Sequence, residues 1–290
     1  MTSTTNYWDN IERVKEFLNT ADAVLVGIGA GMSTAAGLTY SGERFHKYFD
    51  DFHKKYGITD MYSGGFYSFE SMEEYWAWWS RHIYYNRYDI SAGEPYIRLM
   101  ELLQNKNYFV ITTNVDHQMQ FAGVDKNRFY YMQGDYGLWQ CSEPCHQKTY
   151  DNEEQVRRMV KEQKDMKIPT ELIPHCPRCG ELMTMNLRVD GAFVQDEGWY
   201  AAQKRYASFI ENYKDKKTVL LELGVGYNTP MIIKYPFMRM AHDNIDTLYV
   251  PVNIEKQSIP FDIQQNTVLF NNDIQKVLND LLSKEGANVL

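Results

Sequence analysis

Short apolar runs rich in β-branched residues recur along this 290-residue chain, and helical patterns separate most of them. The runs are Ala23–Gly27, Tyr108–Thr112, Thr218–Leu223, Thr247–Val252 and Thr267–Phe270. Each has the length and composition of a buried strand. Before the first run, Ile11, Val14, Phe17 and Leu18 recur at the spacing of one helix face. Because such alternation builds a sheet covered by helices, the sequence predicts an α/β fold with a doubly wound, Rossmann-like parallel sheet.

Two stretches interrupt this alternation and predict a smaller lobe over the sheet. Residues 40–90 are aromatic and contain Ser71-Met-Glu-Glu74, a capping box that predicts the start of a helix. The apolar residues on one face of that helix are Met72, Trp76, Trp79 and Ile83. We interpret these tryptophans and the adjacent tyrosines as core of the lobe. The second stretch, residues 138–186, holds all four cysteines.

The cysteines form two close pairs, Cys141 with Cys145 and Cys176 with Cys179. A tetrahedral zinc site takes four thiolates from two such knuckles, and a site of this kind is structural because no position stays open for water. The alternative is four unconnected buried thiols. His146 and His175 adjoin the pairs and are candidate substitute ligands. The sequence predicts one structural zinc in a ribbon.

The expected organisation is therefore a single domain over residues 1–290. The large lobe is expected to comprise about 1–39, 91–137 and 187–290, and the small lobe about 40–90 (helical) and 138–186 (zinc ribbon).

Composition excludes several classes of protein. The formal net charge of −8 gives no excess of Lys and Arg to neutralise phosphates, so we expect no nucleic-acid partner. No apolar run approaches the roughly 20 residues that span a bilayer, and residues 1–10 lack the pattern of a signal peptide. Four cysteines are too few for a disulfide scaffold. We expect a cytoplasmic protein with no membrane association.

The first apolar run leads directly into a glycine-rich turn, Gly29-Ala-Gly-Met-Ser33, with Gly37 after it. A strand, a glycine turn and a short helix present backbone N–H groups to a phosphate. The dinucleotide fingerprint GxGxxG is not met: Gly27 and Gly29 supply its first two glycines, but Met32 stands where the third belongs. The turn predicts a nucleotide or phosphate site, and a purely structural tight turn is the alternative.

Further motifs follow in a fixed order. They are Thr112-Thr-Asn-Val-Asp116 with Phe121-Ala-Gly123, Gln133-Gly134, the cysteine pairs, Leu187-Arg188, Leu223-Gly-Val-Gly226 and Asn253-Ile-Glu255. Together with the glycine turn, this ordered set resembles the sirtuin family over residues 23 to about 280. The resemblance implies a sirtuin-type Rossmann fold, a zinc ribbon and NAD as co-substrate.

The chain departs from the family pattern at three places. Thr39-Tyr-Ser-Gly42 replaces Pro-Asp-Phe-Arg, Gln133 replaces the histidine that is the general base of deacylation, and Phe193-Val-Gln195 replaces the Phe-Gly-Glu substrate strand. An amide accepts no proton near neutral pH, so deacylation loses its base. This combination resembles the class M branch, which accompanies macrodomain proteins in some bacteria. That resemblance implies transfer of ADP-ribose from NAD to a lipoyl-carrier protein related to the glycine-cleavage H protein, with a macrodomain protein as a partner that reverses the modification.

The resemblance also implies the roles of individual residues. The catalytic candidates are Asn114, Asp116, Gln133 and Arg188. Of these, Asn114, Asp116 and Gln133 are also candidates for binding NAD. The other candidates for binding NAD are Gly29, Ala30, Gly31, Ser33, Gly37, Tyr40, Gly224, Val225, Gly226, Asn253, Glu255 and Ile274.

Each catalytic candidate has a simpler alternative. Asn114 and Asp116 fit a strand-to-helix cap, and Arg188 fits a solvated position at the edge of the ribbon. His117 would lie about 100° around a helix from Asp116, so we expect it to face away from the site. The alternative functions are an NAD glycohydrolase, a weak NAD-dependent lysine deacylase and an NAD-sensing binding protein.

Overall fold

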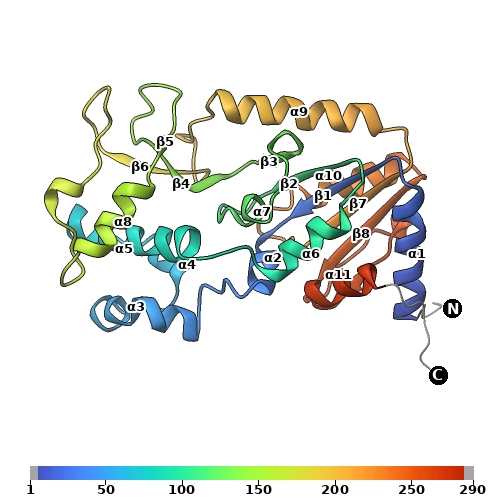
Figure 1. Cartoon of the computed structure of the whole chain (residues 1–290), viewed down its shortest axis with the longest axis horizontal. Coiled ribbons are helices and arrows are strands. Elements are labelled where there is room, and N and C mark those ends of the chain that lie inside the picture. The colour runs from blue at the N-terminus through green and yellow to red at the C-terminus, as the bar shows by residue number, and fades with distance from the viewer. Residues whose placement is uncertain (1–5, 284–290) are drawn as a thin grey trace.

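The computed structural model describes residues 6–283 and has a large and a small lobe, which lie at the right and left of Figure 1. The large lobe contains a six-stranded parallel sheet in the order β3-β2-β1-β7-β8-β9. Its strands are β1 (Ala23–Ile28), β2 (Tyr108–Thr112), β3 (Phe129–Tyr131), β7 (Thr218–Leu223), β8 (Thr247–Asn253) and β9 (Phe270–Asn271). The predicted doubly wound sheet is confirmed, with β1 central and the connections leaving in both directions.

The two edges of the sheet differ from expectation. β3 was not predicted, because three residues carry too little pattern to identify a strand. The predicted strand Thr267–Phe270 is wrong in extent: the strand is Phe270–Asn271, and Thr267 makes only an isolated bridge to Tyr249.

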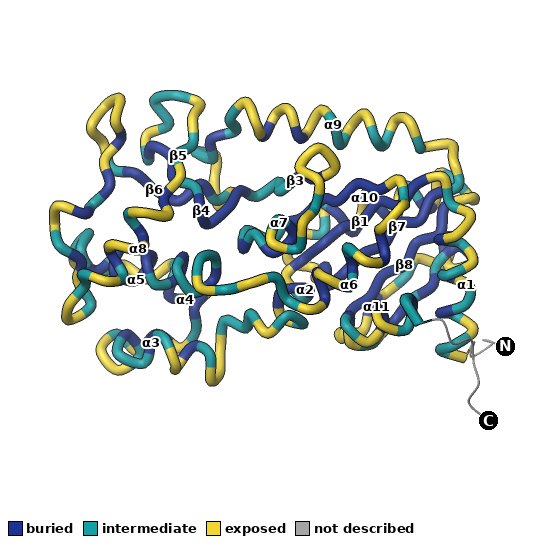
Figure 2. Tube along the Cα trace, in the orientation of Figure 1, coloured by how far each residue is buried: buried dark blue, intermediate teal, exposed yellow. Residues whose placement is uncertain are grey.

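Helices cover both faces of the sheet, which explains why its central strands β1, β2 and β7 are mostly apolar and buried along their whole length. One face packs against α1 (Tyr7–Thr20), α6 (Glu94–Leu102) and α11 (Ile274–Leu282), and the other against α9 (Glu197–Tyr213) and α10 (Lys234–Asp243). Along β1, Val24 and Val26 join the first core while Leu25 joins the second, as side chains of a strand alternate between faces. In Figure 2 the labelled strands β1, β7 and β8 are coloured almost entirely as buried.

The small lobe has a core of its own, in which aromatic side chains pack with aliphatic, methionine and cysteine side chains. Its antiparallel sheet has the order β5-β4-β6. Its strands and principal helices are β4 (Gly134–Cys141), β5 (Tyr150–Asp151), β6 (Met183–Leu187), α3 (Glu43–Tyr56), α4 (Met61–Gly64), α5 (Met72–Ile83) and α8 (Glu153–Glu162). The remaining short helices are α2 (Ala30–Ala35), α7 (Gln118–Phe121), the π-helical turn Tyr84–Tyr88, and the 3-10 turns Lys126–Arg128, Thr170–Leu172 and Phe261–Asn266.

Helix α5 begins where the sequence predicts, but its cap is only half of a capping box. The Ser71 side chain accepts a hydrogen bond from the Glu74 backbone N–H at 3.3 Å. The Glu74 carboxylate instead accepts from Lys55 Nζ at 3.0 Å. Burial also extends beyond the predicted face, because Trp78 packs between Phe49 and Phe52 and is fully buried. The helix therefore crosses the core of the small lobe.

No helix among residues 6–283 combines the length and the apolar composition that a membrane crossing requires.

A buried histidine of α5 makes the stability of the small lobe sensitive to acid. His82 Nε2 lies 2.9 Å from the Tyr136 hydroxyl, and the ring is 2 % exposed. Burial, with the positive charge of Arg44 as a second cause, lowers the pKa of His82 to about 3. The unfolded chain takes up a proton at this position below pH 6.5, whereas the folded protein does not.

We therefore predict that the free energy of unfolding decreases as the pH falls from 6.5 towards 3. The contribution of His82 approaches about 1.4 kcal/mol per pH unit in the lower part of this window. Replacement His82→Gln should make the slope shallower by about this amount between pH 5.5 and 4.5. Urea unfolding at a series of pH values measures both slopes, and parallel curves for the two proteins would contradict the prediction.

Candidate active site

Two glycine turns meet at the carboxyl ends of the neighbouring strands β1 and β7. Gly29 N–H donates to the Leu223 carbonyl at 3.0 Å, and Gly31 N–H donates to the Gly224 carbonyl at 2.9 Å. A Cβ on Gly31 would lie 2.7 Å from Gly224 Cα. Gly224 has φ +65°, and a Cβ there would lie 2.4 Å from the Met32 nitrogen. Only glycines allow the two turns to approach this closely.

A cleft of about 990 Å³ opens beside these turns, at the edge of the sheet where the strands end. This is the position at which doubly wound sheets bind their ligands. The predicted site residues that line it are Gly29, Ala30, Gly31, Asn114, Gln133, Arg188, Gly224, Val225, Gly226, Asn253, Glu255 and Ile274. The structure thus brings together residues from both halves of the chain. Ser33, Gly37, Tyr40 and Asp116 do not line the cleft in this structure.

Asn114 follows β2 and is held against the glycine turn. Its Nδ2 lies 2.9 Å from the Gly29 carbonyl, 2.9 Å from Ser33 Oγ and 3.1 Å from the Tyr96 hydroxyl. Its side-chain oxygen accepts no hydrogen bond from residues 6–283. The amide is therefore fixed at its nitrogen end, and its oxygen is left as an acceptor for a ligand in the cleft.

Asp116 is buried next to Ser33 and does not line the cleft itself. It is 7 % exposed, accepts a short hydrogen bond from Ser33 Oγ and accepts from the Gln118 backbone N–H at 3.2 Å. Burial raises the pKa of Asp116. Ser33 also contacts the Tyr96 hydroxyl at 2.8 Å. Asp116 is therefore connected to the cleft through Ser33: the Ser33 hydroxyl donates a hydrogen bond to Asp116 and accepts one from Asn114 Nδ2.

Gln133 and Arg188 lie together where the two lobes join. Arg188 N–H donates to the Gln133 carbonyl at 3.1 Å, and Gly134 pairs with Leu187 between β4 and β6. Gly134 has φ +94°, and a Cβ there would lie 1.9 Å from the Asn186 carbonyl oxygen. Arg188 is exposed, and none of the ion pairs found within residues 6–283 involves it. Its guanidinium is thus free to reach an anionic group at the cleft.

His117 is not a replacement base for the cleft. It has the left-handed φ of +65°, and its Nδ1 bonds the carboxylate of Asp135. Arg87 Nε contacts the same carboxylate at 2.8 Å. Burial alone would raise the pKa of Asp135, but the hydrogen bond from His117 and the charge of Arg87 together lower it. The expectation that His117 faces away from Asp116 is confirmed, since its partner is Asp135.

The end of β8 and the segment after it form another wall of the cleft, with Asn253 and Glu255. Asn253 is 7 % exposed; its Nδ2 donates to the Val225 carbonyl at 3.3 Å, and its Oδ1 accepts from the Glu255 N–H at 3.1 Å. Asn253 therefore ties the turn after β7 to the segment after β8, while the Glu255 side chain remains exposed at the cleft.

Several cleft residues were not predicted from the sequence. Tyr62 and Phe66 approach from the small lobe, 67 % and 66 % exposed, and their ring centroids are 5.2 Å apart. Tyr227 and Asp273 also line the cleft. Exposed aromatics in an otherwise core-forming aromatic stretch carry no pattern that marks them in advance. The predicted Tyr40 instead contacts the Tyr136 hydroxyl at 2.7 Å, and burial raises its pKa to about 12.

The segment Phe193–Gln195 is not a strand in this structure. The Val194 N–H donates to Gln140 Oε1 at 2.8 Å, and the Val194 carbonyl accepts from Asn186 Nδ2 at 2.9 Å. Side chains thus occupy both backbone groups that a neighbouring strand would use. This finding agrees with the interpretation that the substrate strand of the family pattern is lost at this place.

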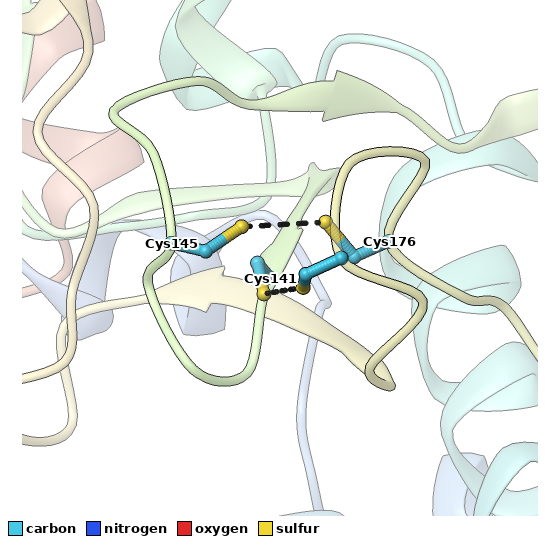
Figure 3. Close-up of side chains that lie close together, drawn as sticks. Cys141, Cys145 and Cys176 are labelled. Atoms are coloured by element: carbon cyan, nitrogen blue, oxygen red, sulfur yellow. Dashed lines mark hydrogen bonds between the residues drawn. The ribbon is translucent and has the colours of Figure 1, made fainter.

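The four cysteines form one cluster. Figure 3 shows the labelled side chains of Cys141, Cys145 and Cys176 close together in it. The four sulfurs all lie within 4.8 Å of one another; Cys141 and Cys179 are 3.5 Å apart, and Cys145 and Cys176 are 3.7 Å apart. Four sulfurs at about 2.3 Å from a tetrahedral zinc lie about 3.8 Å apart. The residues therefore fit a zinc ion, and the alternative of four unconnected thiols is wrong.

Neither neighbouring histidine belongs to the sulfur cluster. His146 Nδ1 lies 2.9 Å from Cys145 Sγ, and its Nε2 lies 2.7 Å from the Tyr150 hydroxyl. His175 Nδ1 instead contacts the Gly180 carbonyl at 2.9 Å.

The two glycines of the turn after β7 give a matched pair of variants. Gly224→Ala should lower the free energy of unfolding by about 2–4 kcal/mol, since it combines a left-handed backbone with a backbone overlap. Nothing lies within 4 Å of a Cβ on Gly226, so Gly226→Ala should change stability by less than about 1 kcal/mol. Equilibrium unfolding in urea measures both, and equal losses would contradict the proposed close contact of the turns.

Comparison with known proteins agrees with this geometry. Residues 29–218 match the model of the Sir2 family. The chain is 40% identical over 275 residues to the "Protein ADP-ribosyltransferase" of Staphylococcus aureus strain Mu50, covering 94% of this chain and 87% of that protein. It is 33% identical over 240 residues to the "Probable bifunctional ADP-ribose hydrolase/ADP-ribosyltransferase" of Fusarium oxysporum f. sp. cubense, covering 78% of this chain but 39% of the fungal protein.

Solved structures show the same fold. Sir2Tm bound to a propionylated peptide superposes with a TM-score of 0.60 at 19% identity, covering 94% of this chain and 97% of that chain. A Sir2 complex with a p53 peptide and NAD gives a TM-score of 0.56 at 19% identity, over 94% and 97% of the two chains. The match to the family model and the similarity to the bacterial relative over most of both chains show that this chain belongs to the Sir2 family.

Proposed function

We propose that this protein is an NAD-dependent protein ADP-ribosyltransferase. The observation that carries the proposal is the cleft itself: two glycine turns, Asn114 and Gln133 line it, and no histidine lines it among the described residues. A deacylase needs a general base near neutral pH, and the Gln133 amide is not one. The 40% identity to a protein named protein ADP-ribosyltransferase supports the same activity.

The cleft residues suit cleavage of the bond between nicotinamide and ribose. The turns at Gly31 and Gly224 would hold the diphosphate, since their backbones can approach it closely. The side-chain oxygen of Asn114 would orient the ribose, and Gln133 would hydrogen-bond its hydroxyls without removing a proton. The bond breaks through an oxocarbenium-like state, which precise orientation and exclusion of water favour.

The transfer step then balances with a nucleophile from the acceptor protein. The nucleophile forms a bond to C1′ of the ribose, the C1′–N bond breaks, neutral nicotinamide leaves and the nucleophile gives up its proton. Arg188 is free of ion pairs among the described residues and would pair with the diphosphate or with an anionic group of the acceptor.

For the acceptor we propose a lipoyl-carrier protein of the glycine-cleavage-H type, as the class M resemblance implies. We also propose a partner that removes ADP-ribose, such as a macrodomain protein. The fungal relative supports this partner, because its name joins an ADP-ribose hydrolase and an ADP-ribosyltransferase in one protein of which this chain covers 39%.

Labelled NAD tests the proposal and its alternatives. Incubation with NAD and a lipoylated carrier protein should place the label on the carrier. Free ADP-ribose as the main product would indicate a glycohydrolase, acyl-ADP-ribose from an acyl-lysine peptide would indicate a deacylase, and binding without turnover would indicate an NAD sensor. Each of these three outcomes contradicts the proposed transfer.

Asn114→Ala should lower the rate of transfer by about 10²-fold or more, because it removes an oriented acceptor from the ribose site. The fold should persist, although the Gly29 and Ser33 contacts of the amide are lost. The control is Asn212→Ala, which removes an exposed asparagine of α9 and should leave the rate unchanged. A transfer rate above about a third of that of the unaltered protein would remove Asn114 from the catalytic residues.

We further propose one structural zinc per chain, held by Cys141, Cys145, Cys176 and Cys179. Metal analysis of reduced, purified protein should give about one zinc per chain. Cys176→Ala should lose the metal and destabilise the small lobe, because zinc binding contributes to folding. His175→Ala is the control: its ring contacts Gly180 and not a sulfur, so the zinc content should stay near one. Equal zinc contents in both variants would contradict the assignment.

A further inference from the structure

The segment that carries Glu255 has no regular secondary structure to fix it. Residues 254–260 lie between β8 and the turn Phe261–Asn266, and most of them are exposed. Gln257 is the one residue of this segment that is buried, at 5 % exposure. The position of Glu255 at the cleft therefore depends on how Gln257 is held.

Gln257 joins a chain of buried polar side chains beneath the cleft. Lys234 of α10 is fully buried, forms an ion pair with Glu222 of β7 and donates to Gln257 Oε1 at 2.9 Å. Glu222 is 2 % exposed and also accepts from the Tyr249 hydroxyl at 2.7 Å. None of these side chains lines the cleft.

The charge of Lys234 determines the orientation of the Gln257 amide. An ammonium group only donates, so the amide oxygen must face Lys234 and the amide nitrogen must face away. Gln257 Nε2 then donates to the Glu255 carbonyl at 3.1 Å, and the Gln257 N–H donates to Asn271 Oδ1 at 3.4 Å. The amide thus links a fixed buried charge to the backbone of Glu255.

The same lysine supports the neighbouring loop. Lys234 Nζ lies 5.1 Å from the ring centroid of Tyr227, a residue that lines the cleft. The Tyr227 hydroxyl in turn accepts from the Ser258 N–H at 3.3 Å. Lys234 cannot shift without leaving Glu222 buried and unpaired, which is costly. The segment that carries Glu255 and the turn that carries Tyr227 are therefore both held by the ion pair of Lys234 with Glu222, which cannot easily move.

We propose that Glu222, Lys234 and Gln257 are positioning residues for the nucleoside end of the substrate, with Gln257 placing Glu255 where it meets the hydroxyls of the adenosine ribose. The inference rests on the proposed use of NAD. An acidic residue after a strand of a doubly wound sheet commonly bonds a nucleoside ribose. Loss of Gln257 should therefore weaken the grip on the adenosine end and leave the chemistry at the nicotinamide end unchanged.

The test uses Gln257→Met, which keeps the volume of the side chain and removes both hydrogen bonds. Lys234 still pairs with Glu222 in this variant, so we expect the protein to fold. The dissociation constant for ADP-ribose should rise about tenfold, the scale of one ordered hydrogen bond. KM for NAD should rise by a similar factor, while kcat at saturating NAD changes by less than about twofold. The control is Gln264→Met, since Gln264 is exposed and its side chain donates one hydrogen bond, at 3.4 Å to the Ile259 carbonyl, away from the buried ion pair.

Four results would overturn the inference. If the unaltered protein binds ADP-ribose and Gln257→Met binds it equally well, this inference fails while the proposed function stands. An equal loss in Gln264→Met, or a fall in kcat that matches the rise in KM, would show a general loosening of structure instead. If the unaltered protein binds neither ADP-ribose nor NAD, the proposed function fails as well.

Discussion

The close approach of the turns after β1 and β7 is the constraint on which the site depends. Gly31 and Gly224 lie backbone against backbone, with no room for a Cβ on either. Because their strands are neighbours in the sheet, the turns also define one end of the cleft. Replacing either glycine would separate the strand ends and widen the surface that we propose to hold a diphosphate. The fold and the ligand surface therefore share one steric condition.

Buried polar side chains then hold the cleft residues in place. On one side, Ser33 connects Asn114 with Asp116 and Tyr96. On the other side, Lys234 connects Glu222 with Gln257. Buried polar groups are costly unless their partners are present, so each network has few alternative arrangements. This explains how side chains that do not touch the ligand surface can still determine its shape.

The small lobe contributes the rest of the cleft through its antiparallel sheet. Strand β4 begins beside Gln133 and ends at Cys141, while β6 begins near Cys179 and ends beside Arg188. The cysteine cluster thus joins the far ends of the two strands whose near ends carry two cleft residues. The cluster therefore acts on the cleft only through the two strands, which present Gln133 and Arg188 at their near ends.

The sequence by itself determined the parallel sheet, the cysteine cluster and the glycine turn after β1, because these follow from local patterns: apolar strands, paired cysteines, and glycines directly after a strand. The other residues of the cleft wall were predicted only because the order of motifs resembles that of the sirtuin family. The sequence did not determine the short edge strands, the irregular segment around Val194 or the buried place of Asp116, since these depend on contacts between distant segments. Gln257 is the clearest case. No pattern in the residues around Gln257 predicts that it is buried. Only the tertiary structure places its amide beside Lys234, because a buried charge needs a hydrogen-bond acceptor and the fold brings this one within reach.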